Sequence, residues 1–387
     1  MNKEKLFNIL DFGVSKIRFS VFDQSFKEKY FISESTSLEN NYSNNFITIK
    51  NIIKNSEKSI SNHIKDIIVI LDPVELFTID LSLNKNLDRK VKLLKVLDSL
   101  LLELNQIIVS SYNNFKIVHT LIDNCIIDDE YYEELPKREI ELSKIKVHFK
   151  LICFPNRIVN DLNYLFNKIN VNVLNFYCTS FVKSLSHIRK LSIDDASFLE
   201  IGLNRTSLIT YKKNKLKSIH SIPIGGFNIT KDIAKIFNIS LEDAEKIKKS
   251  FTKSETEFSY ENNSNDTDII LKEVITKKIS INLLKKVILY RAQEIIDLAF
   301  KKLNSQNHFI NLDDAELFLI GDGSIIFKDN SFDLNNKNQF KNISYYNETD
   351  NEICNSGLVY YLNNYEIPKI INKNQGLFEK FFNFFAK

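Results

Sequence analysis

One short pattern occurs twice in the chain, at residues 10–17 (LDFGVSKI) and 199–206 (LEIGLNRT), about 190 residues apart. In each copy an apolar, strand-like run ends in an acidic residue, a glycine follows two positions later, and a basic residue comes three positions after that glycine. Each copy continues into a second strand-like run, so each predicts a β-hairpin. A hairpin duplicated at this distance predicts two similar lobes that face each other; chance similarity of two short turns is the alternative.

Glycine is scarce in the rest of the chain. Average usage of about 7% would give about 27 glycines at this length, whereas the chain has eight. Those that remain should mark positions where the backbone conformation or a closely approaching ligand excludes a Cβ atom. Six of them follow apolar, strand-like runs, at Gly13, Gly202, Gly225, Gly226, Gly321 and Gly323. This setting is typical of turns that hold phosphates or nucleotides.

Charge and cysteine usage exclude several classes of protein. Lys and Arg total 52 against 49 Asp and Glu, a net charge of +3, so no basic surface for nucleic acid is expected. The four cysteines form no CxxC pair and the histidines no metal-type group, which predicts neither zinc nor disulfides and fits a reducing compartment. No signal peptide and no apolar run long enough to span a bilayer is apparent.

An acidic residue at a strand end, followed by a tight glycine turn, suits polyphosphate binding. The carboxylate can hold Mg²⁺ or its waters, while backbone N–H groups and hydroxyls bind phosphate oxygens. We therefore predict one phosphate site at Asp11, Gly13, Ser15 and Lys16, and another at Glu200, Gly202, Asn204, Arg205 and Thr206. Two ordinary hairpin turns with surface charges are the alternative.

Two further segments extend the predicted nucleotide site. Gly225 and Gly226 lead into a helix, and Ser240 begins a second helix through a Ser-x-x-Asp capping pattern. On that second helix Glu245 and Lys248 share a face, where they could bond a ribose or form a solvated ion pair. The loop Gly321, Asp322, Gly323 and Ser324 ends a buried strand expected at residues 315–320.

The region between the two repeats reads as a compact α+β insertion. Leucines and a valine at helical spacing predict a helix over 85–110, strands are expected at 115–123 and 145–154, and an amphipathic run covers 157–169. Residues 254–268 and 330–350 are polar and read as loops.

These motifs together resemble the FtsA family of the actin-like ATPase superfamily. The segment SIPIGG at 221–226, continuing to Lys248, is the most specific match, and residues 11–16, 119–153, 287–296 and 320–324 also resemble family segments. The resemblance implies an α/β, two-lobed actin-like (ribonuclease H-like) ATPase fold with an FtsA-type 1C insertion subdomain. The implied parts are lobe I at 1–83 and 171–196, subdomain 1C at 84–170, lobe II at 197–230 and 296–355, subdomain 2B at 231–295, a return and linker at 356–371, and a terminal helix at 372–387.

The resemblance also implies ligands and partners. They are ATP, Mg²⁺ held by Asp11, further copies of the chain, other division proteins, and the C-terminal tail of FtsZ at subdomain 2B, with the chain on the cytoplasmic side of the inner membrane at the division septum. Arg291 matches a basic position for that tail, although it could equally be a solvated helix charge. Glu200, Leu203, Asn204 and Arg205 depart from the usual second phosphate loop, and Asp322 stands where the family has glycine. We therefore expect weak or absent ATP hydrolysis.

The last eleven residues have one apolar face. On a helical wheel Leu377, Phe378, Phe381, Phe382, Phe384 and Phe385 fall within roughly 160°. This pattern predicts an amphipathic membrane helix, and a terminal helix docked on its own core is the alternative. An FtsA-like pilus-assembly ATP-binding protein and an active actin-fold phosphotransferase or chaperone ATPase are the rival functions.

Overall fold

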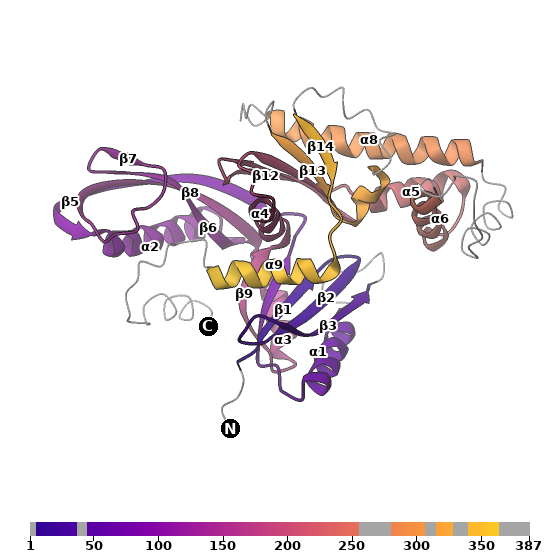
Figure 1. Cartoon of the computed structure of the whole chain (residues 1–387), viewed down its shortest axis with the longest axis horizontal. Helices are drawn as coiled ribbons and strands as arrows, with labels where there is room; N and C mark the ends of the chain where they lie inside the picture. The colour runs from indigo at the N-terminus through magenta and orange to yellow at the C-terminus, as the bar shows by residue number, and fades with distance from the viewer. Residues whose placement is uncertain (1–4, 37–44, 255–279, 306–314, 328–339, 364–387) are drawn as a thin grey trace. The chain divides into compact units, whose positions relative to one another are not determined.

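The computed structural model describes residues 5–36, 45–254, 280–305, 315–327 and 340–363 (Figure 1). The chain divides into two compact units: unit 1 comprises residues 1–77 and 154–359, and unit 2 comprises residues 78–153 and 360–387. Among the described residues, no helix combines the length and the hydropathy that crossing a membrane requires. Three expected segments lie wholly or partly outside the described residues: the terminal helix at 372–387, residues 255–268 of the loop expected at 254–268, and residues 330–339 of the loop expected at 330–350.

The first sheet of unit 1 has the strand order β3-β2-β1-β4-β9. Its strands are β1 (Phe7–Phe12), β2 (Lys16–Phe22), β3 (Glu28–Ser35), β4 (Asp66–Leu71) and β9 (Asn172–Cys178). The β1–β2 and β2–β3 pairs are antiparallel, whereas β4 is parallel to β1 and to β9. The central strands β1 and β4 are apolar and almost entirely buried, as expected for strands covered on both faces. Helices α1 (Phe46–Ile60) and α3 (Asn156–Asn167) contact β3 and β9 respectively.

The second sheet of unit 1 repeats this topology. Its order is β12-β11-β10-β13-β14, with antiparallel pairs among the first three strands and parallel pairs among the last three. The strands are β10 (Ala196–Ile201), β11 (Thr206–Lys212), β12 (Lys215–Ile222), β13 (Glu316–Ile320) and β14 (Asn342–Tyr345). The two sheets confirm the predicted duplication and the two-lobed fold. In the text below, each sheet with its helices is called a lobe.

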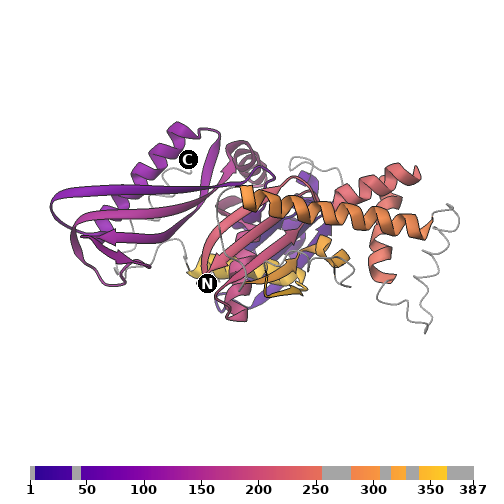
Figure 2. The same ribbon diagram turned by 90° about the horizontal axis from the view of Figure 1, so that it is seen from above.

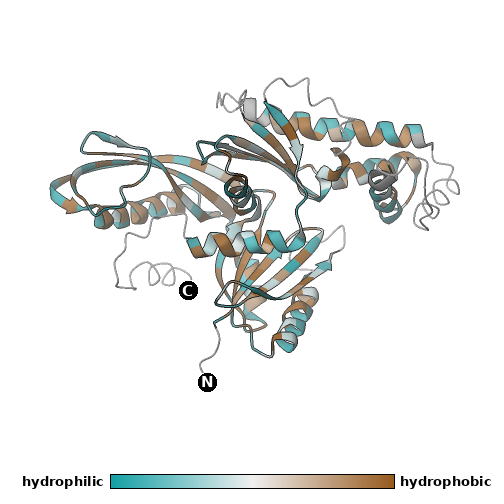
Figure 3. Ribbon diagram, viewed as in Figure 1, coloured by the Kyte–Doolittle hydropathy of each residue, from teal (hydrophilic) through white to brown (hydrophobic). Residues whose placement is uncertain are grey.

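Three helices belong to the second lobe. They are α5 (Gly226–Phe237), α6 (Leu241–Ser254) and α8 (Ile281–Ser305), and α8 lies across β11 and β12 (Figure 2). In α8, buried Leu284, Ile288, Ala292, Ile295 and Ala299 recur every three or four residues, which places them on one face toward the core (Figure 3). Helix α4 (Thr179–Leu191) contacts β9 of the first sheet and β10 and β11 of the second, so it lies between the lobes.

Within residues 78–153, unit 2 contains a sheet of order β5-β8-β6-β7 and helix α2. The elements are β5 (Phe77–Lys92), α2 (Leu93–Ser111), β6 (Phe115–Ile127), β7 (Glu130–Tyr132) and β8 (Glu141–Pro155). The helix predicted over 85–110 was wrong in its first part, which is strand. Leu87 and Val91 are four residues apart, a spacing that fits both a helix and alternate positions of a strand. The predicted insertion at 84–170 included α3, whereas the compact division assigns α3 to unit 1.

The chain returns to the first lobe through η2 (Asp322–Phe327), β14 and α9 (Asp350–Asn363). The expected loop at 330–350 was therefore wrong for 342–345, where the apolar partner strand β13 outweighs the polar composition of β14. Gly357 lets α9 approach the first sheet closely, because a Cβ atom there would lie 3.0 Å from Ile70 Cγ2 and 3.1 Å from Ile9 Cγ2.

Candidate functional site

One cleft in unit 1 is lined by turns from both lobes. Gly13 follows β1, Gly202 follows β10 and Gly321 follows β13, and all three line this cleft. The predicted residues that line it are Asp11, Gly13, Ser15, Glu200, Gly202, Asn204, Arg205, Gly321 and Asp322. The duplicated hairpins therefore bring their acidic strand ends to one place.

Eight predicted residues are not among those that line the cleft: Lys16, Thr206, Gly225, Gly226, Glu245, Lys248, Gly323 and Ser324. Ser324 donates a hydrogen bond to the carbonyl of Gly321 at 2.6 Å and so closes its own turn. Thr206 donates to the carbonyl of Ile224 at 2.8 Å. These contacts give both hydroxyls a role within lobe II.

Glu245 and Lys248 form a buried pair rather than a solvated one. The Lys248 ammonium lies 2.7 Å from Glu245, and it also donates to the Gly226 carbonyl at 3.0 Å and to the Thr230 hydroxyl at 2.9 Å. Both side chains are buried. Burial lowers the pKa of the Lys248 ammonium below its usual value although Glu245 opposes the shift. The pair ties α6 to the start of α5, and its contact with a ribose stays a prediction.

The glycines of lobe II pack against backbone atoms of the chain itself. A Cβ atom at Gly225 would lie 2.4 Å from the carbonyl oxygen of Gly202, and one at Gly323 would lie 2.8 Å from that of Ile201. Gly321 has φ +85°, which a residue with a side chain rarely adopts, and it too meets the Ile201 carbonyl. The scarcity of glycine therefore pointed to the cleft, but close backbone packing explains these positions without a ligand.

Arg18 neutralises the carboxylate at the end of β1. Its Nη1 donates to Asp11 Oδ2 at 2.8 Å, and Thr179 at the start of α4 donates to the other oxygen of Asp11 at 3.2 Å. Burial is the largest influence on Asp11 and raises the pKa of its carboxyl, although Arg18 opposes this. Arg18 also bonds Asp350 at 2.6 Å, and Lys16, predicted to grip phosphate, lies 2.9 Å from the same carboxylate.

Asp72 is a third strand-end carboxylate, which sequence reasoning missed. It follows β4 directly, accepts from the backbone N–H of Ser180 at 2.9 Å and lies 2.5 Å from Arg205 Nη2. An anion near the first turn of α4 suits the positive end of that helix. Burial would raise the pKa of Asp72, but Arg205 holds it below its usual value. The triplet ILD, at 9–11 and again at 70–72, was the signal that could have revealed it.

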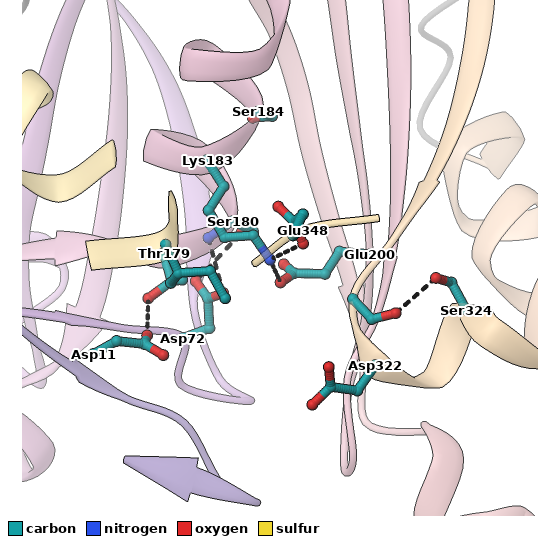
Figure 4. A network of polar contacts seen from close by, with 12 residues as sticks. Asp11, Asp72, Thr179, Ser180, Lys183, Ser184, Glu200, Asp322, Ser324 and Glu348 are labelled. Atoms are coloured by element: carbon teal, nitrogen blue, oxygen red, sulfur yellow. Dashed lines mark hydrogen bonds and ion pairs between the residues drawn. The ribbon is translucent and has the colours of Figure 1, made fainter. Parts of the chain in front are cut away.

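Lys183 on α4, also missed, lies between two acidic residues (Figure 4). Its Nζ is 2.7 Å from Glu200 Oε1 and 2.8 Å from Glu348 Oε2, and all three side chains are buried. His187, one turn along α4, is 2.6 Å from the other oxygen of Glu348. Burial would lower the pKa of the Lys183 ammonium, yet the two carboxylates raise it well above its usual value. Lys183 is therefore held in its charged form.

These contacts decide whether the site fits Mg²⁺. Both oxygens of Asp11, Asp72 and Glu200 already accept hydrogen bonds or ion pairs, and each carboxylate contacts Arg18, Arg205 or Lys183. Mg²⁺ takes six oxygen ligands at about 2.0–2.1 Å, several of them usually waters, so direct coordination by one of these carboxylates would have to displace a buried cation of the chain. Among the described residues, no three His, Cys, Asp or Glu side chains are placed to hold a metal ion. The arrangement does not fit direct coordination of Mg²⁺ by Asp11.

The Glu348 carboxyl gives a pH prediction. Burial would raise its pKa, but Lys183 and His187 lower it to about 2, from the usual 4.5. A lowered pKa stabilises the fold above pH 4.5, and this contribution, of roughly 3 kcal/mol at most, is lost as the pH falls toward 2. We expect Glu348→Gln to be less stable than wild type at neutral pH and to lose less stability on acidification.

Urea denaturation at a series of pH values between 7 and 3 measures this difference. Glu352→Gln is the matched control, because Glu352 lies on the same segment but forms a more exposed pair with Lys190. Equal pH slopes for wild type and Glu348→Gln would contradict the prediction.

Part of the chain is similar in sequence to cell division protein FtsA. The family model for cell division protein FtsA matches residues 198–346, which run from β10 to just after β14. FtsA of Bacillus subtilis (strain 168) is 28% identical over 112 residues, which cover 28% of this chain and 24% of that protein. The match therefore spans about a quarter of that relative.

Solved structures resemble the chain over nearly its whole length. The PilM-PilN type IV pilus biogenesis complex gives a TM-score of 0.61 at 13% identity, covering 95% of this chain and 100% of that one. MreB5 of Spiroplasma citri bound to ADP gives 0.49 at 10% identity, covering 93% and 97%. The PilM-PilN match supports the two-lobed, actin-like fold, and the second lobe of the chain is similar in sequence to the matching part of cell division protein FtsA.

Proposed function

We propose that the chain is a non-catalytic actin-fold scaffold of the FtsA type, which self-associates on the cytoplasmic face of the inner membrane and tethers FtsZ at the division septum. The observation that carries this proposal is the FtsA family match over residues 198–346. The matched segment includes the second sheet except for the first two residues of β10, together with α5, α6 and α8. ATP, in this proposal, is a bound ligand that is turned over slowly at most.

The cleft supports a scaffold over a phosphotransferase. An active enzyme of this fold would need carboxylates free to hold a metal or to orient a nucleophile. Asp11, Asp72 and Glu200 are instead engaged by cations of the chain. This arrangement favours a scaffold that binds partners over an enzyme that transfers a phosphoryl group.

Arg291 is the proposed contact for the C-terminal tail of FtsZ. It lies on α8, where its Nε is 2.5 Å from Asp232 Oδ2 and its Nη2 is 3.1 Å from the other oxygen of Asp232. The guanidinium therefore already joins α8 to α5, and a tail carboxylate would have to share or replace Asp232. Its partial exposure, 28% of the side chain, leaves room for such an exchange.

The proposed membrane anchor is the apolar face of residues 377–387. Burial of a Phe or Leu contributes about 1.5–3 kcal/mol, while ordering the backbone costs about 1–2 kcal/mol per residue. One copy would bind membrane weakly and reversibly, so several linked copies are needed for stable attachment. Self-association is thus part of the same proposal.

Co-sedimentation of the full chain with anionic phospholipid vesicles and an FtsZ tail peptide tests the proposal. We expect the wild-type protein to sediment with the vesicles and to carry the FtsZ tail peptide with it. The protein lacking residues 377–387 should stay in the supernatant. Glu379→Gln, on the polar face, is the matched control and should bind vesicles like wild type. Unchanged binding after the deletion would support a docked terminal helix instead. Binding of a peptide from PilN, the PilM partner, in place of the FtsZ tail would favour the pilus-assembly alternative.

A further inference from the structure

We infer that this chain closes its cleft with its own cations, and that the closed state requires neither a divalent metal nor a nucleotide. Three basic side chains form ion pairs with the carboxylates that face the cleft: Arg18, Lys183 and Arg205. All three are buried and line the cleft. Metal-free closure would hold whatever partners the scaffold binds.

Arg205 provides the direct tie between the lobes. It precedes β11 in the second lobe, and its Nη2 lies 2.5 Å from Asp72, which follows β4 in the first. The same nitrogen lies 3.4 Å from Glu200 at the end of β10. One guanidinium thus bridges acidic strand ends of both sheets, which is the geometric task a bound cation would otherwise perform.

Arg18 forms a second tie in the opposite direction. It belongs to β2 of the first lobe, and its Nη2 lies 3.8 Å from Asp322, which follows β13 in the second. Lys183 completes the set from α4 between the lobes, where it joins Glu200 to Glu348. The pairs of Lys183 and Arg205 are buried, and buried ion pairs are strongly sensitive to the loss of one partner. Asp322 is 68% exposed, so its pair with Arg18 contributes little and the closed arrangement depends mainly on Lys183 and Arg205.

The same arrangement predicts which group an anionic ligand in the cleft would contact first. The second terminal nitrogen of Arg205, Nη1, is buried without a hydrogen-bond partner among the described residues. A phosphate or carboxylate entering the cleft would find this guanidinium donor in place of a metal ion. Arginine binds such groups with fixed geometry and keeps its charge at any physiological pH.

The distance between spin labels on the two lobes tests the inference. Ile47→Cys on α1 and Tyr290→Cys on α8 place labels at highly exposed positions, 71% and 74% exposed, while the four native cysteines are buried. We expect the same narrow distance distribution in EDTA without nucleotide and in MgCl₂ with ATP. A shift to a shorter distance on adding MgCl₂ and ATP would overturn the inference.

Single substitutions then show whether the charge of Arg205, rather than the overall stability of the fold, holds the two lobes at a fixed distance. We expect Arg205→Met to have a broader distance distribution than wild type. Arg205→Lys, which keeps the positive charge, should have a narrower distribution than Arg205→Met. Asp72→Asn, which keeps an acceptor for the start of α4, should broaden it as well and serves if Arg205→Met does not fold. Arg157→Met is the control, because Arg157 forms an exposed ion pair with Glu75 within the first lobe. An unchanged distribution in both Arg205→Met and Asp72→Asn would show that the tie does not hold the lobes.

Discussion

Lys183→Met is expected to cost about 3–5 kcal/mol of folding free energy, one of the two largest losses that we predict for a single substitution. Lys183 is the only described cation within ion-pair distance of both Glu200 and Glu348, and it lies in the buried centre of the site. Methionine has a similar shape, so the loss would report charge rather than a cavity. Urea denaturation at pH 7 measures it as a lower midpoint with an unchanged slope.

Two comparisons make the Lys183 prediction specific. Lys190→Met, two turns along the same helix, removes a largely exposed pair with Glu352 and should cost no more than about 1 kcal/mol. Adding Glu200→Gln and Glu348→Gln to Lys183→Met should recover part of the loss, because no uncompensated buried charge then remains. A loss for Lys183→Met as small as that for Lys190→Met would contradict the proposed role of the ammonium.

Gly225→Ala is the second large effect. The new Cβ would lie 2.4 Å from the Gly202 carbonyl oxygen, 2.6 Å from that of Leu203 and 2.8 Å from the Arg205 nitrogen, and all three are backbone atoms that cannot rotate away. The loop after β10 would have to move from α5, which breaks the hydrogen bond from the Gly226 N–H to the Gly202 carbonyl at 2.9 Å. Overpacking of this kind costs about 1–3 kcal/mol and occasionally more.

The neighbouring glycine provides the control. A Cβ at Gly226 would meet nothing closer than the Lys248 ammonium at 3.6 Å, an ordinary contact with a flexible side chain. Alanine is also favoured over glycine inside a helix by about 0.5–1 kcal/mol. Gly226→Ala should therefore be neutral or stabilising in thermal unfolding. Equal melting temperatures for the two variants would contradict the close packing at Gly225.

The sequence was sufficient to predict the two lobes and the location of the cleft. The repeated hairpins carried that information locally, since each acidic strand end and its glycine lie within three residues of each other. Gly13, Gly202 and Gly321 line one cleft because equivalent strands end at equivalent places in two sheets of the same topology. Local periodicity also located α3 and most of α2.

The ion pairs of the cleft could not be predicted in the same way. Arg205 and Asp72 are 133 residues apart, and Arg18 and Asp350 are 332 apart. No local spacing relates such residues, and a charged residue in a sequence reads as exposed by default. Glu245 and Lys248 show the same difficulty at short range, because their shared helix face was evident but its burial against α5 was not.

Glu348 has a consequence for motion within unit 1. The backbone passes between the two sheets twice, once from α4 into β10 and once from β14 into α9. Glu348 lies on the second passage, and Lys183 and His187, which bind it, lie on the helix that leads into the first. The two connections between the sheets are therefore joined by ion pairs, so that a change in the backbone of one must disturb the other. Connections joined in this way resist rotation of one sheet against the other, and we expect the two lobes to keep a fixed relative orientation.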